Sequence, residues 1–316
     1  MKSKYCLGSS KENLSNSEST KDSYGYSRFP ETIERIEYGR FRNIYLYITE
    51  KCQLRCGHCY MGNRLKNNTS MPTEKVFSTL QLWRKMGGSK LSILGGEPTM
   101  HEDFVDICRY AKHLGYEKVI LNTNGLRNTI QQLSQMESNE FSYIQVSLDG
   151  GSSFSHNKIR GSGTFNITWS TIEYLINRGF DTRVICTVNK KNRGDCLDLI
   201  ERCEKAGVSL LKFHVFSTIG NGQGNTEWGM TPKEWINFYE ELEDRKKHYN
   251  ISIWYQPSYA TSETIIKFIR EGYKGCIGRT LDRISVFPDG KAYVCSYLFD
   301  TEFNMFNTGN GKILLN

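Results

Sequence analysis

The stretch Ile44–Tyr60, IYLYITEKCQLRCGHCY, decides the fold class of this chain. Its apolar first part, Ile44–Ile48, predicts a buried strand, and three cysteines follow closely: Cys52, Cys56 and Cys59. A cubane iron–sulfur cluster takes one thiolate per iron, so three thiolates leave the fourth iron with an open coordination position. The spacing therefore predicts a cluster that takes part in chemistry as well as storing an electron.

Zinc and disulfide sites are the alternatives for these thiols. Structural zinc usually takes four ligands from two separated pairs, and no second pair follows at the usual distance. His58 could be a fourth ligand, but it lies between two of the cysteines, where one ion would have to bend the chain sharply. An odd number of neighbouring cysteines also makes a poor disulfide framework. A non-catalytic zinc-binding or scaffold protein remains the rival from another class.

Short apolar runs alternate with amphipathic stretches from about residue 41. We expect strands at Asn43–Thr49, Lys90–Leu94, Lys118–Asn122, Tyr143–Leu148, Thr182–Val188 and Leu210–Phe216, and helices at Thr73–Met86, Glu102–Leu114, Leu126–Met136, Asn166–Arg178 and Gly194–Ala206. Such alternation predicts an α/β fold with a parallel sheet and outer helices. Six units suit a partial (β/α)6 TIM-type barrel, followed by a small C-terminal extension that contains a β-hairpin.

Polar and glycine-rich motifs follow the predicted strands at their carboxyl ends. They are GGEP at Gly95–Pro98, NTNG at Asn122–Gly125 and SLDG at Ser147–Gly150. Ligand-binding residues of parallel α/β folds gather at this edge of the sheet. We therefore expect these motifs to lie beside the cysteines.

Each motif suits one part of a ligand. Gly95 and Gly96 let the backbone approach a ligand closely, and the turn, with the Glu97 carboxylate, suits a cationic amino group; a plain tight turn is the alternative. Ser147 and Asp149 can bind sugar hydroxyls. Arg160 can bind a carboxylate through its planar fork. S-adenosylmethionine carries an amino group, a carboxylate and a ribose, and would use all of these residues.

The cysteine loop, GGEP and SLDG resemble the radical S-adenosylmethionine superfamily over roughly residues 42 to 216. The resemblance implies a [4Fe-4S] cluster whose fourth iron is chelated by S-adenosylmethionine, and a reductant such as flavodoxin or ferredoxin. It implies that the three cysteines hold the cluster, and that the cofactor lies with its adenine near Tyr60, its amino group at the GGEP loop (Gly95, Gly96 and Glu97), its ribose at Ser147 and its carboxylate at Arg160. Asn124 and Asp149 are further expected cofactor contacts.

The C-terminal part contains Cys276, the FPDG turn at Phe287–Gly290, and Cys295. The turn predicts a hairpin of Ile284–Phe287 with Lys291–Ser296. This resembles the opening half of a SPASM or twitch extension, which carries auxiliary iron–sulfur clusters, but no cysteine follows Cys295. Three interpretations stay open: an auxiliary cluster with another ligand, a hairpin that only packs, or a thiol that donates a hydrogen atom to a substrate radical.

The function expected from the resemblance is hydrogen-atom abstraction from a biosynthetic intermediate, a ribosomal peptide or an aminoglycoside or sugar natural product. The outcome would be dehydrogenation, cross-linking or epimerisation. A methyl- or sulfur-transferring member of the superfamily is a further alternative. The glycine-rich segment Ile219–Asn225 lacks the Lys-Ser/Thr of a phosphate-binding P-loop, and we expect it to be a mobile substrate or cofactor loop.

Composition predicts the organisation and the setting of the chain. We expect a disordered segment at 1–38, a core at 39–255 and the extension at 256–316. No apolar run approaches the roughly 20 residues needed to cross a bilayer, so a cytoplasmic protein with no membrane partner is expected. The net charge of +7 is dispersed along the chain, and no basic stripe with stacking aromatics indicates nucleic acid. The substrate should be a small molecule or a peptide.

Overall fold

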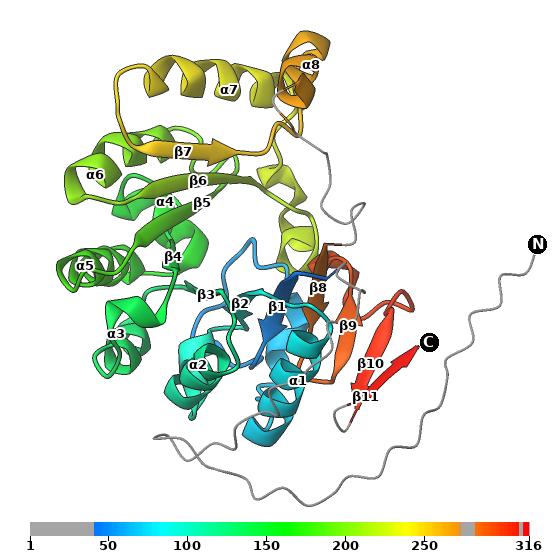
Figure 1. Cartoon of the computed structure of the whole chain (residues 1–316). Helices are drawn as coiled ribbons and strands as arrows, with labels where there is room; N and C mark the ends of the chain where they lie inside the picture. The colour runs from blue at the N-terminus through cyan, green and yellow to red at the C-terminus, as the bar shows by residue number, and fades with distance from the viewer. Residues whose placement is uncertain (1–40, 271, 273–281, 310–311, 316) are drawn as a thin grey trace, which may run out of the picture. The chain divides into compact units, whose positions relative to one another are not determined.

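The structure, a computed structural model, describes residues 41–270, 272, 282–309 and 312–315. The segment expected to be disordered, 1–38, and Cys276 lie outside the described residues. The described residues belong to one compact unit, in which an 11-stranded sheet has the strand order β11-β10-β9-β8-β1-β2-β3-β4-β5-β6-β7 (Figure 1).

The strands from β1 to β8 all run parallel to one another, and β9, β10 and β11 continue the sheet from β8 in antiparallel pairs. Their bounds are β1 Asn43–Tyr47, β2 Lys90–Leu94, β3 Lys118–Thr123, β4 Tyr143–Ser147, β5 Thr182–Val188, β6 Leu210–Val215, β7 Ser252–Tyr255, β8 Arg283–Val286, β9 Lys291–Tyr293, β10 Phe306–Gly309 and β11 Lys312–Leu315. The expected α/β class and the β8–β9 hairpin are confirmed.

The helices connect successive parallel strands and lie along the outer side of the curved sheet (Figure 1). Their bounds are α1 Thr73–Lys85, α2 Phe104–His113, α3 Arg127–Leu133, α4 Ser153–Arg160, α5 Thr164–Asn177, α6 Leu199–Ala206, α7 Pro232–Lys246 and α8 Ser262–Arg270, with 3-10 helices η1 Gly62–Lys66 and η5 Gly220–Trp228 near the site. None of the helices in the described residues is long and apolar enough to cross a membrane.

The strands alternate between two environments. Along β5, residues Thr182, Val184, Cys186 and Val188 are buried and the residues between them are half-buried. Alternation with period two places the buried set against the helices and the half-buried set on the inner face of the sheet. This pattern positions side chains from several strands on one shared inner face.

Two helices differ from the expectation. The helix expected from Gly194 begins only at Leu199, because the preceding residues form a turn and a 3-10 segment. Helix α4 (Ser153–Arg160) was not expected at all. Its sequence SFSHNKIR is rich in residues of modest helix propensity, and it ends at Gly161, whose φ of +122° favours glycine.

The C-terminal hairpin joins the main sheet, because β8 pairs in parallel with β1. The ring of Phe287 stacks on Tyr47 with centroids 4.2 Å apart. Tyr47 and Phe287 belong to a buried cluster against which Cys52, Cys59 and Tyr60 pack. The hairpin therefore lies beside the cysteine loop. That 256–316 is a SPASM- or twitch-like extension stays a prediction.

Candidate radical chemistry site

The three cysteines follow β1 at the carboxyl edge of the sheet. Cys56 is buried, Cys52 and Cys59 are half-buried, and all three thiols are free. Burial raises the pKa of Cys52 to about 11 and that of Cys56 to about 12. The uncoordinated thiols are therefore neutral near pH 7, and ionisation as ligands would come from a bound metal.

The donor set fits an iron–sulfur cluster. Hydrogen-bond donors face two of the sulfurs: the Leu54 amide lies 3.4 Å from Cys52 Sγ, and Arg160 Nη1 lies 4.0 Å from Cys56 Sγ. Such donors stabilise thiolates and tune a cluster. In the part of the chain that the structure describes, no group of three or more His, Cys, Asp or Glu side chains could hold a single metal ion.

Gly95 and Gly96 hold the GGEP loop against the chain that leads into the cysteines. A Cβ at Gly96 would lie 2.5 Å from the Lys51 carbonyl oxygen and 2.9 Å from the Cβ of Cys52. The Gly96 amide donates to the Thr49 carbonyl at 2.8 Å. Only glycine permits this approach, so the two loops pack backbone to backbone; a contact with the amino group of a ligand stays a prediction.

Glu97 connects the ends of β2 and β3 from a fully buried position. Its carboxylate accepts hydrogen bonds from the Thr99 hydroxyl at 2.7 Å, the Thr123 hydroxyl at 2.8 Å and the Asn124 amide at 2.7 Å. Burial raises the pKa of Glu97, and these hydrogen bonds oppose the rise. The expected contact of Glu97 with a ligand is untested, and within the structure the carboxylate braces the two loops.

Asn124 reaches back to the cysteine loop. Its Nδ2 lies 3.9 Å from Cys52 Sγ and donates to the Gln53 side-chain oxygen at 3.3 Å, while its Oδ1 accepts from the Leu126 amide at 3.1 Å. The motif after β3 therefore lies beside the first cysteine, as we expected for the motifs at the carboxyl ends of the strands.

Asp149 forms a buried charged group with residues from two other segments. Its Oδ2 accepts from His58 Nε2 at 2.7 Å and from Arg160 Nε at 2.6 Å, and its Oδ1 accepts from the Thr187 amide at 2.7 Å. Burial alone would raise the pKa of Asp149, but Arg160 and His58 more than offset it and hold the pKa well below its usual range. Asp149 is fully buried, so it positions His58 and Arg160; its contact with a ribose stays a prediction.

His156 is a residue of this site that the sequence reasoning missed. Its Nδ1 accepts a hydrogen bond from the Asp149 amide at 3.0 Å, while its buried Nε2 has no partner in the described residues. Burial lowers the pKa of His156 to about 3, which keeps the ring neutral. The sequence alone contained no signal for it, because the four-residue spacing of His156 and Arg160 places them on one helix face only once helix α4 is known.

The two other expected contacts differ in their surroundings. Ser147 ends β4 half-buried, and its hydroxyl has no hydrogen bond within the described residues. The Tyr60 hydroxyl lies 2.7 Å from that of Tyr47, and its ring packs edge-on against Tyr297 at 5.5 Å. Tyr60 therefore faces the C-terminal segment, and its place near an adenine stays a prediction.

The glycine-rich segment after β6 packs on the cysteine loop. Asn221 donates from its amide to the Cys59 carbonyl at 2.9 Å and from its side chain to the Cys56 carbonyl at 3.0 Å. Asn225 donates to the Gly57 carbonyl at 2.9 Å. Gly220 has φ +63°, and a Cβ there would lie 2.3 Å from the Tyr60 carbonyl oxygen. The sequence predicted a mobile loop here, whereas the structure has a 3-10 segment that packs on the cysteine loop and hydrogen-bonds to its backbone.

Cys295 lies half-buried just after β9. The hydroxyl of the next residue, Ser296, lies 2.9 Å from that of Ser285 on β8. Tyr297 then packs on Tyr60. The segment that carries Cys295 is therefore anchored beside the residue that follows the third cysteine.

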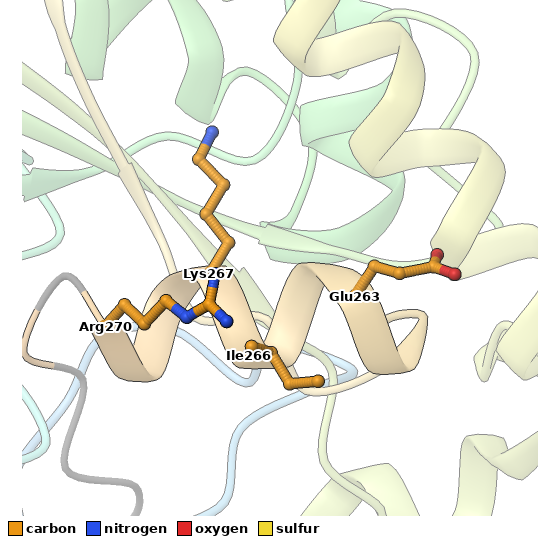
Figure 2. A pocket seen from close by; sticks show the side chains of 4 residues that line it. All are labelled: Glu263, Ile266, Lys267 and Arg270. Atoms are coloured by element: carbon orange, nitrogen blue, oxygen red, sulfur yellow. The ribbon is translucent and has the colours of Figure 1, made fainter.

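Two surface pockets lie elsewhere. One of about 450 Å³ lies along α8 and is lined by Glu263, Ile266, Lys267 and Arg270 (Figure 2). The other, about 570 Å³, lies over α5 and α6. Neither is lined by any of the expected site residues.

The sequence model of the radical SAM superfamily matches residues 46–203, half of the chain. The chain therefore belongs to this superfamily and is a radical SAM enzyme, and the cofactors of that family are a [4Fe-4S] cluster and S-adenosylmethionine.

This chain is similar to a curated relative and to solved structures. A probable GTP 3',8-cyclase of Saccharolobus solfataricus is 26% identical over 286 residues, covering 87% of this chain and 89% of that protein. Streptococcus suis SuiB bound to S-adenosylmethionine has a TM-score of 0.67 at 18% identity, and the match covers 83% of this chain but only 62% of SuiB. The AdoMet-bound enzyme anSMEcpe has a TM-score of 0.66 at 20% identity, covering 84% and 77%. These structures share the fold of this chain.

Proposed function

We propose that this enzyme abstracts a hydrogen atom from a biosynthetic intermediate, a ribosomal peptide or a sugar-containing natural product such as an aminoglycoside. The product would be dehydrogenated, cross-linked or epimerised. The peptide alternative is supported by SuiB, a neighbour in fold that was solved with the precursor peptide SuiA. When bound at the cluster, S-adenosylmethionine supplies a 5′-deoxyadenosyl radical for this step.

One observation carries the proposal: three free, buried or half-buried thiols are held at the carboxyl end of β1 by loops from three other strands. The GGEP loop packs against the chain before Cys52, Asn124 reaches Cys52, and Asn221 fixes the carbonyls of Cys56 and Cys59. Preorganisation of this kind is what a cluster-binding loop needs. Within the proposal, Ser147 and Arg160 bind the cofactor, and Asp149 aims Arg160.

The test is release of 5′-deoxyadenosine by anaerobically reconstituted protein with dithionite and S-adenosylmethionine. Cys56→Ala should lose cluster iron and abolish the release. Cys108→Ala is the matched control, because Cys108 is a fully buried thiol on α2, and it should retain both. Unchanged release by Cys56→Ala would refute the assignment.

For epimerisation, Cys295 is the proposed hydrogen-atom donor. Its S–H bond would break as a C–H bond forms at the substrate radical, and a reductant such as ferredoxin or flavodoxin would return an electron and a proton to the sulfur. In deuterated water the wild type should place solvent deuterium at the changed carbon. Cys295→Ala should lose that deuterium while still releasing 5′-deoxyadenosine. Cys203 is a buried thiol on α6, and the control variant Cys203→Ala should keep the deuterium. Deuterium retained in Cys295→Ala and Cys276→Ala would exclude the donor role.

Metal analysis separates the remaining alternatives. About four irons per chain indicate the single cluster, and more than four indicate an auxiliary cluster that uses Cys276 or Cys295. A colourless protein that contains zinc would support the scaffold alternative. A product heavier by a methyl group or a sulfur atom would place the enzyme among the transferring members of the superfamily.

A further inference from the structure

The inner face of the sheet carries a group of cations. Four lie at half-buried strand positions: Lys90 on β2, Arg183 on β5, Lys212 on β6 and Arg283 on β8. We call these the inner-face cations. The described strands β1 to β8 contain no Asp or Glu. The face opposite the helices is therefore basic.

The inner-face cations lie close enough to repel one another. The pKa of Lys212 is lowered to about 8, first by burial and then by Lys90, Arg283 and Arg183. Strands β6 and β8 are separated by five others in the sheet order. Only the curvature of the sheet, visible in Figure 1, brings their side chains together across the inner face.

Protein acids do little to neutralise this group. Arg183 pairs with Asp181 at 2.8 Å, but within the described residues Lys90, Lys212 and Arg283 have no ion-pair partner. The carboxylate of Asp282, which raises the pKa of Lys90, is bonded to Arg42 and Asn43.

Aromatic rings surround the cations without neutralising them. Lys212 lies 4.3 Å from the centroid of Trp254, and Arg283 lies 5.0 Å from that of Tyr45. The Nε of Arg283 is buried and has no hydrogen-bond partner in the described residues. Half-buried charges are rarely kept in this state without a counter-ion.

The position of the cations in the sheet indicates the direction in which a bound ligand would extend. Lys90 and Arg283 are the first residues of their strands, whereas the cysteines follow the carboxyl end of β1. At about 3.3 Å per residue, the length of β2 from Lys90 to Leu94 is about 13 Å. A ligand held by the cations at one end can therefore extend along the inner face toward the cysteine edge.

We propose that the inner-face cations bind an oxyanion, a phosphate or carboxylate group, of the substrate and so hold its other end toward the cysteine edge. Anion binding by these cations is independent of the proposed function, and the inference rests on that function only where it identifies the bound molecule as the substrate. It favours an acidic or phosphorylated substrate over a polycationic aminoglycoside, because a polycation would be repelled from this face.

The test measures anion binding without turnover. Inorganic phosphate and glutarate are titrated by calorimetry into the anaerobically reconstituted full chain at low ionic strength, and iron content is checked afterwards. At least one anion should bind the wild type, and added salt should weaken the binding. Lys212→Gln and Arg283→Gln should each weaken it tenfold or more. Lys212→Arg keeps the charge and should still bind.

The control variant is Lys247→Gln, because Lys247 is an exposed cation at the end of α7. Its binding should match the wild type. Tighter binding of phosphate than of glutarate assigns a phosphorylated substrate, and the reverse assigns a carboxylate. Failure of both anions to bind, or equal binding by Lys212→Gln, Arg283→Gln and the wild type, would overturn the inference. Protein that binds an anion but releases no 5′-deoxyadenosine would refute the proposed function alone.

Discussion

Arg64 is the residue whose replacement should most weaken the attachment of the C-terminal hairpin to the cysteine loop. Its side chain is 3% exposed and lies within 2.6 Å of Glu50 Oε1, which is equally buried. It also pairs with Asp289 at 2.8 Å and with Asp300 at 2.6 Å, and it lies 4.8 Å from the ring centroid of Phe287. One guanidinium thus connects η1 to the residues after β8 and β9.

The magnitude follows from the burial of each partner. Arg64→Met leaves the Glu50 carboxylate buried without its cation, which lowers the free energy of unfolding by about 3–5 kcal/mol. The side chains of Asp289 and Asp300 are 36% and 59% exposed, so their loss adds less than about 1 kcal/mol each. We expect a total loss of about 3–7 kcal/mol.

The assay is equilibrium denaturation of the anaerobic protein, followed by circular dichroism. Adding Glu50→Gln to Arg64→Met should recover about 2 kcal/mol, because the stranded charge is removed. Arg245→Met is the control: the Arg245–Asp198 pair is exposed, and its loss should change the stability by less than about 1 kcal/mol. A loss below about 1 kcal/mol in Arg64→Met, or a double variant as unstable as the single one, would show that the reasoning is wrong.

Two further predictions concern the glycine loop and the inner face. Gly96→Ala should lose cluster iron, because its Cβ would lie 2.5 Å from the Lys51 carbonyl oxygen. Gly194→Ala is the control and should retain the iron, because no atom lies within 4 Å of the new Cβ. Equal iron content in the two variants would contradict the packing argument. The pKa of Lys212 is lowered from 10.5 to about 8. Below pH 8 the charge of Lys212 therefore opposes folding by at most about 3 kcal/mol. The folded protein loses this proton before the unfolded chain does, so the penalty is relieved as the pH rises from about 8 toward 10.5. Denaturation curves should show that relief in the wild type and a smaller one in Lys212→Met; identical pH profiles would argue against a desolvated lysine.

The order of strands and helices could be predicted because each element carries its own local pattern. The alternation along β5 and the apolar run before Cys52 appear in any short window of sequence. Helix α4 could not be predicted in this way, since its propensity is weak and contacts from other segments support it. The Ser155 hydroxyl donates to Asp195 at 2.6 Å, and His156 accepts from the Asp149 amide.

The sequence by itself determined the strand–helix alternation, the cysteine spacing and the motifs after β2, β3 and β4, and with them the membership of the radical SAM superfamily. Only the tertiary structure decided that Asp149 holds both His58 and Arg160, that Arg64 joins η1 to the C-terminal hairpin, and that four cations share the inner face. These contacts join residues tens to hundreds of positions apart. Local periodicity contains no information about such distances, because the curvature of the sheet sets them.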